Sequence, residues 1–452
     1  MTTIAVDSDF FEWTVTDLPF AEPTPGQWID GARDTPPAAS TLPSATSAVL
    51  QITTFFRSVS GILIGAVGVV LVTVWLTEGW GQWMTEQTLR DTVLREEQAA
   101  LAGDAVTLLT LTNTPDRAWL DQRLERAANG LFAPSPLRGL RPVAEAGRVQ
   151  TVTRRAADFY QVDVARAHTN ADGNTYTFTL PQFYQRADGV WQRTLAPESY
   201  WGARSRLIGR FVEINHYATD RDVALELLPY LDEVLARFCA DWGCADQPPI
   251  SVDLANRYYQ WPDVPALRPA DPLLFSVLPP HVTRYPDYAL LVPSPHEVGY
   301  PSEPTGRDLW RRAVGVQMLF AAMDRLAFRD GRRDAVGNAY FYALVVRESV
   351  RLGLDPVTVL RGPALPIPER LTTQRYWDFR GGVWRRPDVI RNALVMLNEW
   401  LAEAPPETDR ALLRAMPAAR SPEEWLAAGT GLSPEAAAAQ VSDALARIVA
   451  AP

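Results

Sequence analysis

The stretch TYTFTLPQFYQRADGVWQRTLAP, Thr175 to Pro197, contains the clearest β-hairpin pattern in the chain. Strand-forming residues occupy 175–180 and 183–186, and they return over 190–195. Between the last two runs stands Asp188-Gly189. This dipeptide is typical of a two-residue hairpin turn, because aspartate and glycine tolerate the positive φ that such a turn needs. We therefore predict antiparallel strands on both sides of the turn.

Helices are predicted before this hairpin. Residues 85–101 and 116–129 each carry apolar side chains at helical spacing, and the pattern changes to strand-like alternation near Tyr160 to Val164. Helices that lead into long antiparallel strands, together with the segments YQRADGVWQRT and YWG, resemble the NTF2-like family of α+β domains. The resemblance covers residues 85–205.

The NTF2-like resemblance implies a sheet that curls round a cavity. It does not allow us to assign the Asp–His pair of enzymes in that family, because Asp163 and His168 are close in sequence but are predicted to lie on a turn. We expect the aromatic residues to fill the core rather than to line a ligand pocket. The candidates to line a cavity are Tyr160, Phe178, Phe183, Tyr184, Trp191 and Trp201.

A second region, 206–452, begins with a strand, a helix over 219–238 and a strand over 249–255. Two further strands (273–278 and 288–295) and two helices (306–328 and 339–352) follow, and the C-terminal part from Pro387 is helical. This order resembles the peptidase-MA-like (gluzincin) metallopeptidases.

In that metallopeptidase family an HExxH helix holds zinc, but the matching helix here, Ala313 to Met323, has neither histidine nor glutamate. Glu348 stands where a third ligand would be, and one carboxylate is not a zinc site. The resemblance therefore implies a degenerate scaffold with no catalytic residue, no metal and no cofactor. The pair His296-Glu297 is interpreted as part of a loop.

The sequence VSGILIGAVGVVLVTVWL, Val59 to Leu76, has no charged residue. Phe55 and Phe56 precede it, and Trp80 and Trp83 follow it, as in the aromatic belts of membrane spans. A bilayer core needs about 20 apolar residues of helix. We therefore predict a transmembrane helix over 55–80, with a buried helix of a soluble core as the alternative. The residues that would let another helix approach closely are Gly61, Gly65 and Gly68.

Orientation and compartment rest on few residues. Arg57 before the uncharged run favours a cytoplasmic N-terminus. Cys239 and Cys244, in CADWGC, can pair if Gly243 adopts a left-handed conformation, and a disulfide would indicate an oxidising space outside the cytoplasm. The alternative is two free buried thiols. We expect the C-terminal domains to be extracytoplasmic.

The N-terminal tail, 1–54, is acidic and rich in threonine, proline, serine and alanine, so we predict disorder. Its aromatic islands, Phe10–Trp13 and Leu18–Phe20, either bind a protein partner or are incidental in a solvated tail.

Composition excludes several classes of function. Lysine is absent, so there is no P-loop lysine, no pyridoxal Schiff base and no Ser-x-x-Lys dyad. No GxSxG occurs, and no two of the four histidines have HExxH spacing. The net charge of −10 opposes nucleic-acid binding, which needs a basic face.

The predicted fold class is α+β: a single transmembrane helix, an NTF2-like domain, and a mixed α/β pseudopeptidase-like domain with a C-terminal helical subdomain. We expect a non-enzymatic, membrane-anchored protein that binds a partner or ligand. The alternatives are a carboxylate-dependent hydrolase and a structural subunit of a membrane complex. The carboxylates considered for the hydrolase are Asp220, Asp222, Glu226, Glu297 and Glu303.

Overall fold

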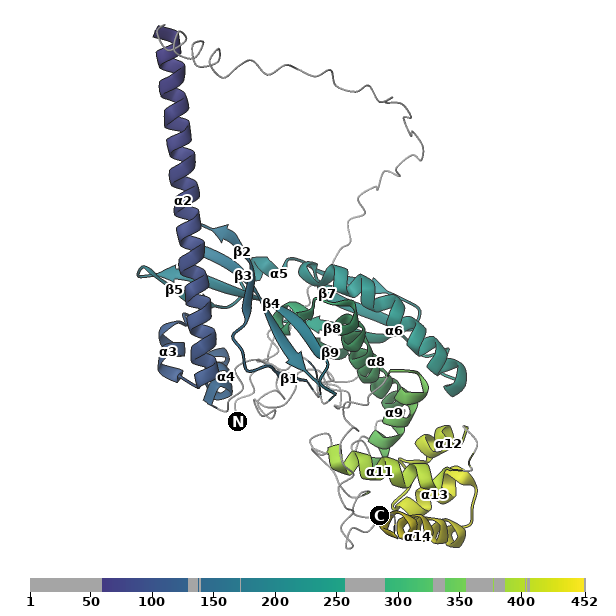
Figure 1. The fold of residues 1–452 in the computed structure, drawn as a ribbon. Coiled ribbons are helices and arrows are strands. Elements are labelled where there is room, and N and C mark those ends of the chain that lie inside the picture. Colours follow the sequence, from purple (N-terminus) through teal and green to yellow (C-terminus); the bar gives the residue numbers. More distant parts are fainter. Residues whose placement is uncertain are drawn as a thin grey trace, which may run out of the picture. The chain divides into compact units, whose positions relative to one another are not determined.

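The computed structural model divides the chain into two compact units, 1–78 and 79–452 (Figure 1). The N-terminal tail and the strand predicted over 273–278 lie outside the described residues. The structure describes residues 59–128, 137, 140–170, 172–256, 289–327, 338–354, 377, 387–402, 404 and 407–450.

Helix α2 runs from Val59 to Ala102 and contains the uncharged run. In the part of the chain that the structure describes, no helix is long and apolar enough to cross a membrane. This finding contradicts the predicted fold class, in which residues 55–80 form a transmembrane helix. The helix that forms has 44 residues, and past the uncharged run it carries Glu86, Arg90 and Asp91. The described fold is α+β.

The predicted hairpin lies in an antiparallel sheet in which β3 and β4 pair along most of their length. Asp188 and Gly189 have φ of 51° and 82°, as the predicted turn requires. Strands β2 and β1 pair with β3, and strands β5 and β10 pair with β4. The strands are β1 (Arg141–Pro142), β2 (Arg148–Ala156), β3 (Phe159–Thr169), β4 (Thr175–Ala187), β5 (Val190–Thr194) and β10 (Tyr300–Pro301).

Alternation along these strands gives the sheet two different faces. One face packs on α2, where Leu89 and Val93 are fully buried against it. Short helices α3 (Ala105–Thr110) and α4 (Arg117–Ala128) follow α2 in the chain. The buried side chains on the α2 face of the sheet are Tyr160, Val162, Val164, Tyr184 and Trp191. The opposite face of the sheet forms a wall of the candidate site.

A second sheet has the strand order β6-β7-β8-β9. Strands β7, β8 and β9 are parallel, and β6 is antiparallel to β7. Helix α6 connects β7 to β8, and buried residues such as Val212 and Ile214 alternate with half-buried ones along β7. The elements are β6 (Arg204–Ile208), β7 (Val212–Tyr217), η1 (Ala218–Asp220), α6 (Arg221–Trp242), β8 (Ile250–Ala255) and β9 (Ala289–Pro293).

Helices complete this part of the chain, and those predicted over 306–328 and 339–352 are confirmed. An aromatic cluster of Tyr340, Trp377, Trp400 and Trp425 is buried among them. These rings belong to the same hydrophobic core as α6 and the second sheet. The helices are α8 (Pro304–Ala327), α9 (Ala339–Arg351), α11 (Pro387–Trp400), α12 (Glu407–Ala415), α13 (Pro422–Thr430) and α14 (Pro434–Ala450).

The segment that leaves β9 returns to the first sheet. Strand β10 pairs Tyr300 and Pro301 with β4. The backbone N–H of Ser302 donates to the carbonyl of Thr177 at 3.0 Å, and the N–H of Thr177 donates to Glu303 at 3.1 Å. This attachment holds the short helix α7 (Pro295–Val298) opposite the sheet face that α2 leaves free.

Candidate functional site

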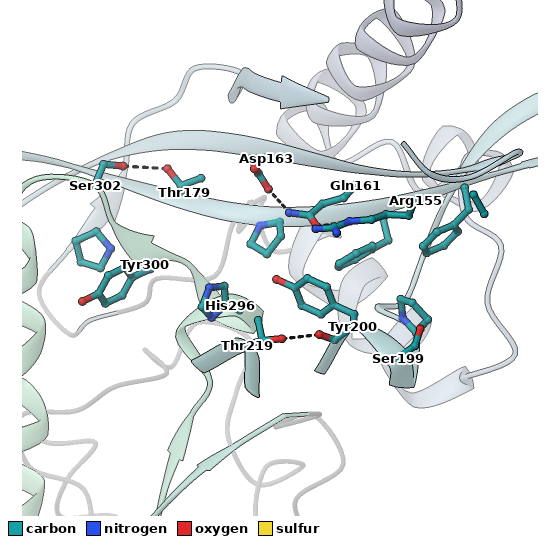
Figure 2. Close-up of a pocket in the computed structure, with 16 residues that line it drawn as sticks. Arg155, Gln161, Asp163, Thr179, Ser199, Tyr200, Thr219, His296, Tyr300 and Ser302 are labelled. Atoms are coloured by element: carbon teal, nitrogen blue, oxygen red, sulfur yellow. Dashed lines mark hydrogen bonds between the residues drawn. The ribbon is translucent and has the colours of Figure 1, made fainter. Parts of the chain in front are cut away.

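A cavity of about 910 Å³ lies on that sheet face (Figure 2). Its lining combines alternate residues of β3 and β4 with residues from α5 (Glu198–Trp201), η1, α7 and β10. The residues that carry the argument below are Arg155, Phe159, Gln161, Asp163, Phe183, Tyr200, His296 and Tyr300. The cavity is therefore built by segments of the chain that are far apart in sequence.

One wall of the cavity is aromatic. The rings of Phe159 and Phe183 are stacked with centroids 5.9 Å apart. Tyr200 meets Phe183 edge to face, with centroids 4.7 Å apart. Such a wall offers flat apolar surface to an aromatic or aliphatic group.

Polar groups stand beside this wall on β2 and β3. The side-chain amide of Gln161 donates to Asp163 at 2.7 Å, and its carbonyl oxygen accepts from Arg155 at 2.6 Å. The positive and negative side chains are thus held at the two ends of one amide. This part of the cavity presents hydrogen-bonding groups with no net charge.

A histidine–aspartate pair stands at the opposite wall. Nδ1 of His296 lies 2.8 Å from Oδ1 of Asp220, and the hydroxyl of Ser294 donates to the same oxygen at 2.8 Å. The side chain of Asp220 is fully buried, whereas that of His296 is 29% exposed. Because a carboxylate can only accept, the proton of this bond belongs to the imidazole.

The chain order explains why these two residues meet. Asp220 comes three residues after β7 ends at Tyr217, and His296 comes three residues after β9 ends at Pro293. Both strands are parallel to β8, so their carboxyl ends lie at one edge of the sheet. Ligand sites in open α/β sheets commonly form at this edge.

Two tyrosine hydroxyls near the cavity keep their protons. Burial, reinforced by Asp163 and Asp220, raises the pKa of Tyr200 far above its usual value. Burial also raises the pKa of Tyr300, whose hydroxyl donates to Glu226 at 3.1 Å. Figure 2 shows the hydroxyl of Tyr200 turned toward the side on which His296 lies. Tyr200 is therefore available as a hydrogen-bond donor at neutral pH.

The six aromatic residues considered from the sequence do not come together. Phe183 lines the large cavity, and Tyr160, Tyr184 and Trp191 fill the core against α2. Phe178 belongs to the main core. Trp201 packs against Tyr200 and Tyr217 and borders a smaller pocket. Two other cavity residues, Asp163 and His296, were named from the sequence but placed wrongly. Asp163, predicted on a turn with His168, lies with it in β3, and His296, predicted in a loop, lies in α7.

The helix-packing glycines Gly61, Gly65 and Gly68 all lie in α2. A Cβ placed on Gly68 would meet no other atom of the described chain within 4 Å. The packing of another helix against these glycines stays a prediction.

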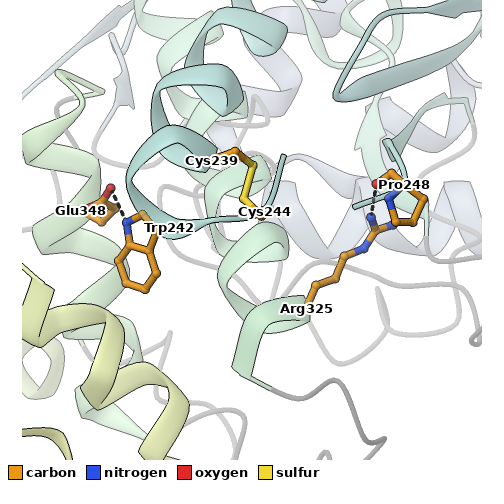
Figure 3. The surroundings of a disulfide bond; sticks show 6 residues. All are labelled: Cys239, Trp242, Cys244, Pro248, Arg325 and Glu348. Atoms are coloured by element: carbon orange, nitrogen blue, oxygen red, sulfur yellow. Dashed lines mark hydrogen bonds between the residues drawn. A yellow bond between two sulfur atoms is a disulfide. The ribbon is translucent and has the colours of Figure 1, made fainter. Parts of the chain in front are cut away.

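Cys239 and Cys244 form a disulfide at the end of α6 (Figure 3). Gly243 adopts the left-handed conformation, with φ of 69°, and its N–H bonds to the carbonyl of Cys239. The indole of Trp242 donates to Glu348 at 3.0 Å. Arg351 also pairs with Glu348, so the carboxylate at the expected third-ligand position is held in structural contacts. No cluster of potential metal ligands occurs among the described residues.

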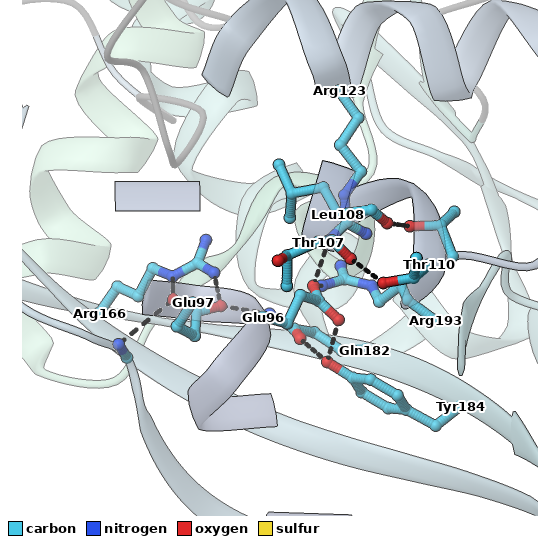
Figure 4. A network of polar contacts seen from close by, with 12 residues as sticks. Glu96, Glu97, Thr107, Leu108, Thr110, Arg123, Arg166, Gln182, Tyr184 and Arg193 are labelled. Atoms are coloured by element: carbon cyan, nitrogen blue, oxygen red, sulfur yellow. Dashed lines mark hydrogen bonds and ion pairs between the residues drawn. The ribbon is translucent and has the colours of Figure 1, made fainter. Parts of the chain in front are cut away.

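A second polar cluster joins α2 to the first sheet (Figure 4). Glu96 accepts from Arg123 at 2.5 Å, Arg193 at 2.9 Å and Tyr184 at 2.9 Å. Glu97 forms a salt bridge with Arg166. All four carboxylate oxygens have partners. This cluster therefore fixes α2 to the sheet.

Comparison with protein-family models, with curated proteins and with solved structures found no match. The resemblances to NTF2-like and peptidase-MA-like domains therefore stay predictions. The candidate site rests on its own geometry.

Proposed function

We propose that the cavity binds a neutral organic ligand that carries an aromatic or compact apolar group next to a carbonyl or hydroxyl. The observation that carries this proposal is the aromatic wall of Phe159, Phe183 and Tyr200 beside the bonded polar group of Gln161. A volume of about 910 Å³ falls within the range of roughly 300–1,000 Å³ that is common for small-molecule sites.

Charge supports a neutral ligand over an ionic one. Arg155 and Asp163 are bonded to the same amide and offset each other. Asp220 is fully buried behind His296, with hydrogen bonds from His296 and Ser294. A singly charged ligand at this wall would be attracted by one of these two side chains and repelled by the other.

The disulfide supports a second proposal, that this domain works in an oxidising space outside the cytoplasm. Disulfides persist in such compartments and are rare in the cytosol. Transfer of cells directly into denaturant that contains a maleimide, followed by reduction and a second label, tests it. We expect Cys239 and Cys244 to be protected until reduction. Labelling of both thiols before reduction contradicts the proposal.

Ligand binding is tested by saturation-transfer NMR with the full chain and matched probes. Benzamide and benzyl alcohol should bind saturably, and benzoate and benzylammonium should bind more weakly. Phe159→Ala removes part of the aromatic wall and should weaken benzamide binding about tenfold, which corresponds to about 1.4 kcal/mol.

Val152→Ala is the matched control, because Val152 packs on the α2 face of the same sheet. It should leave the affinity for benzamide unchanged. Absence of saturable binding by the wild type, or equal loss in both variants, contradicts the proposed function.

A further inference from the structure

We propose, building on the proposed ligand cavity, that His296 is a general base, oriented by Asp220, that activates water to hydrolyse a neutral ester bound there. His296 lines the cavity, and its Nδ1 lies 2.8 Å from Asp220. With the proton held on Nδ1, the lone pair of the imidazole is on Nε2. That is the protonation form a general base needs.

The orienting carboxylate is built into the fold. Asp220 is fully buried at the end of η1, and its Oδ1 accepts from both His296 and Ser294. Its other oxygen, Oδ2, is buried and has no partner among the described residues. A buried carboxylate that is left with an unpaired oxygen is costly to keep, so its retention beside an imidazole points to a role in orienting that ring.

Tyr200 supplies the donor that an ester carbonyl requires. Its hydroxyl stays protonated because burial raises its pKa. The ring borders the cavity and contacts Phe183. A hydrogen bond from Tyr200 to the carbonyl oxygen would strengthen as negative charge develops on that oxygen.

The nucleophile is water, since the hydroxyl groups next to His296 are engaged elsewhere. Ser294 donates to Asp220, and Thr219 donates to the carbonyl of Tyr200 at 2.5 Å. In the proposed step, Nε2 of His296 takes a proton from water as the water oxygen bonds to the ester carbon. The C–O bond to the alcohol then breaks, and the alcohol oxygen takes the proton from His296. One ester and one water become one acid and one alcohol.

Three of the carboxylates considered for a carboxylate-dependent hydrolase are less suited to hydrolysis by a pair of acids, as in glycoside hydrolysis. Glu226 is bonded to Tyr300 and pairs with Arg311. Glu303 accepts from the backbone of Thr177. Asp220 is hydrogen-bonded to His296. A pair of acids facing one bond, which glycoside hydrolysis requires, is not formed by these residues.

The experiment measures release of 4-nitrophenolate from 4-nitrophenyl acetate and 4-nitrophenyl benzoate by the full chain. Benzamide, which resists hydrolysis, reports binding in the same samples. His296→Gln should lower kcat at least about 100-fold while its affinity for benzamide stays within about twofold. Tyr200→Phe should lower kcat less than His296→Gln does.

Asp220→Asn tests positioning, because it keeps the shape and changes the hydrogen-bonding of Nδ1. It should lower kcat with little change in KM. Glu297→Gln, on the same short helix but outside the lining of the large cavity, is the matched control and should keep wild-type rates.

The outcomes separate the two proposals. Saturable benzamide binding without saturable hydrolysis of either ester overturns the general-base assignment and leaves the ligand cavity standing. Hydrolysis that persists in His296→Gln overturns it as well. Lack of benzamide binding by the wild type contradicts the proposed function itself.

Discussion

Asp220 and His296 are 76 residues apart in the chain and form a 2.8 Å hydrogen bond beside the cavity. Their meeting depends on two parallel strands that end at one edge of the second sheet. The pair is also part of the stability of the fold, because the aspartate is fully buried. Its removal therefore has consequences that can be measured without any ligand.

His296→Ala should destabilise the protein by about 1–3 kcal/mol, because it leaves Ser294 as the partner of a buried carboxylate. Urea unfolding followed by circular dichroism measures this cost. Arg221→Ala, an exposed neighbour of Asp220, should change the free energy of unfolding by less than about 0.5 kcal/mol. Equal changes in the free energy of unfolding would show that the Asp220–His296 pair does not stabilise the fold.

Glu96→Gln should cost about 3–5 kcal/mol, because it removes one side of a buried ion pair and leaves Arg123 and Arg193 without their counter-charge. Asp121→Asn breaks an exposed pair with Arg117 and should cost less than about 1 kcal/mol. Denaturant unfolding of both variants provides the comparison. Similar costs for the two changes would contradict the structural role of the buried cluster.

Acid should lower the free energy of unfolding by protonating Glu96. Burial opposes its charge, but Arg123 and Arg193 outweigh burial and hold its pKa below the ordinary value of 4.5. A carboxyl group with a lowered pKa stabilises the fold above the unfolded value, and that contribution is lost as the pH falls through the folded value. The free energy of unfolding should therefore fall more steeply below pH 4.5 in the wild type than in Glu96→Gln. If the free energy of unfolding depends on pH in the same way in both proteins, the predicted role of Glu96 is contradicted.

The buried aromatic cluster predicts a large effect at Trp425. Its indole is fully buried, lies 5.6 Å from the ring of Trp377 and donates to the carbonyl of Leu412 at 2.7 Å. Trp425→Ala should cost about 3–5 kcal/mol. Trp83→Ala is the matched control, because Trp83 is 49% exposed. Thermal unfolding distinguishes the two, and a small loss at Trp425 would mean that the helices pack more loosely than described.

The disulfide closes a short loop, so its contribution should be modest. Cys239 and Cys244 are five positions apart, and closure of such a loop is worth about 2 kcal/mol in the chain-entropy model. The double variant Cys239→Ala/Cys244→Ala should lower the unfolding free energy by that amount. Dithiothreitol should not change the free energy of unfolding of the variant, but it should lower that of the wild type. Unchanged wild-type stability after full reduction would contradict this.

Local patterns predicted much of the fold. The Asp188-Gly189 turn and its flanking strands are confirmed, because a two-residue hairpin is fixed by neighbouring residues. The helix predicted over 219–238 is confirmed as α6, with its buried stripe. The predicted transmembrane helix over 55–80 was wrong, because no helix in the described part of the chain is long and apolar enough to cross a membrane.

The cavity was missed for a different reason. Neighbours on a strand face opposite sides, so Phe183 and Tyr184 could not both line one pocket, and alternation alone would have separated them. The pairing of Asp220 with His296 needed the parallel order of β7 and β9. That order depends on contacts between distant segments, which a single sequence does not reveal.

The cavity is lined by two parts of the chain, which the two-residue strand β10 joins by pairing with β4. Ligand binding should therefore be coupled to the docking of these two parts. A ligand that touches both β4 and α7 would favour the state in which they are docked, by the free energy of its binding. The amide protons of Thr177 and Ser302, which bond across this junction, would then exchange with solvent more slowly as the ligand concentration rises. Hydrogen exchange at these two amides would thus report occupancy of the cavity.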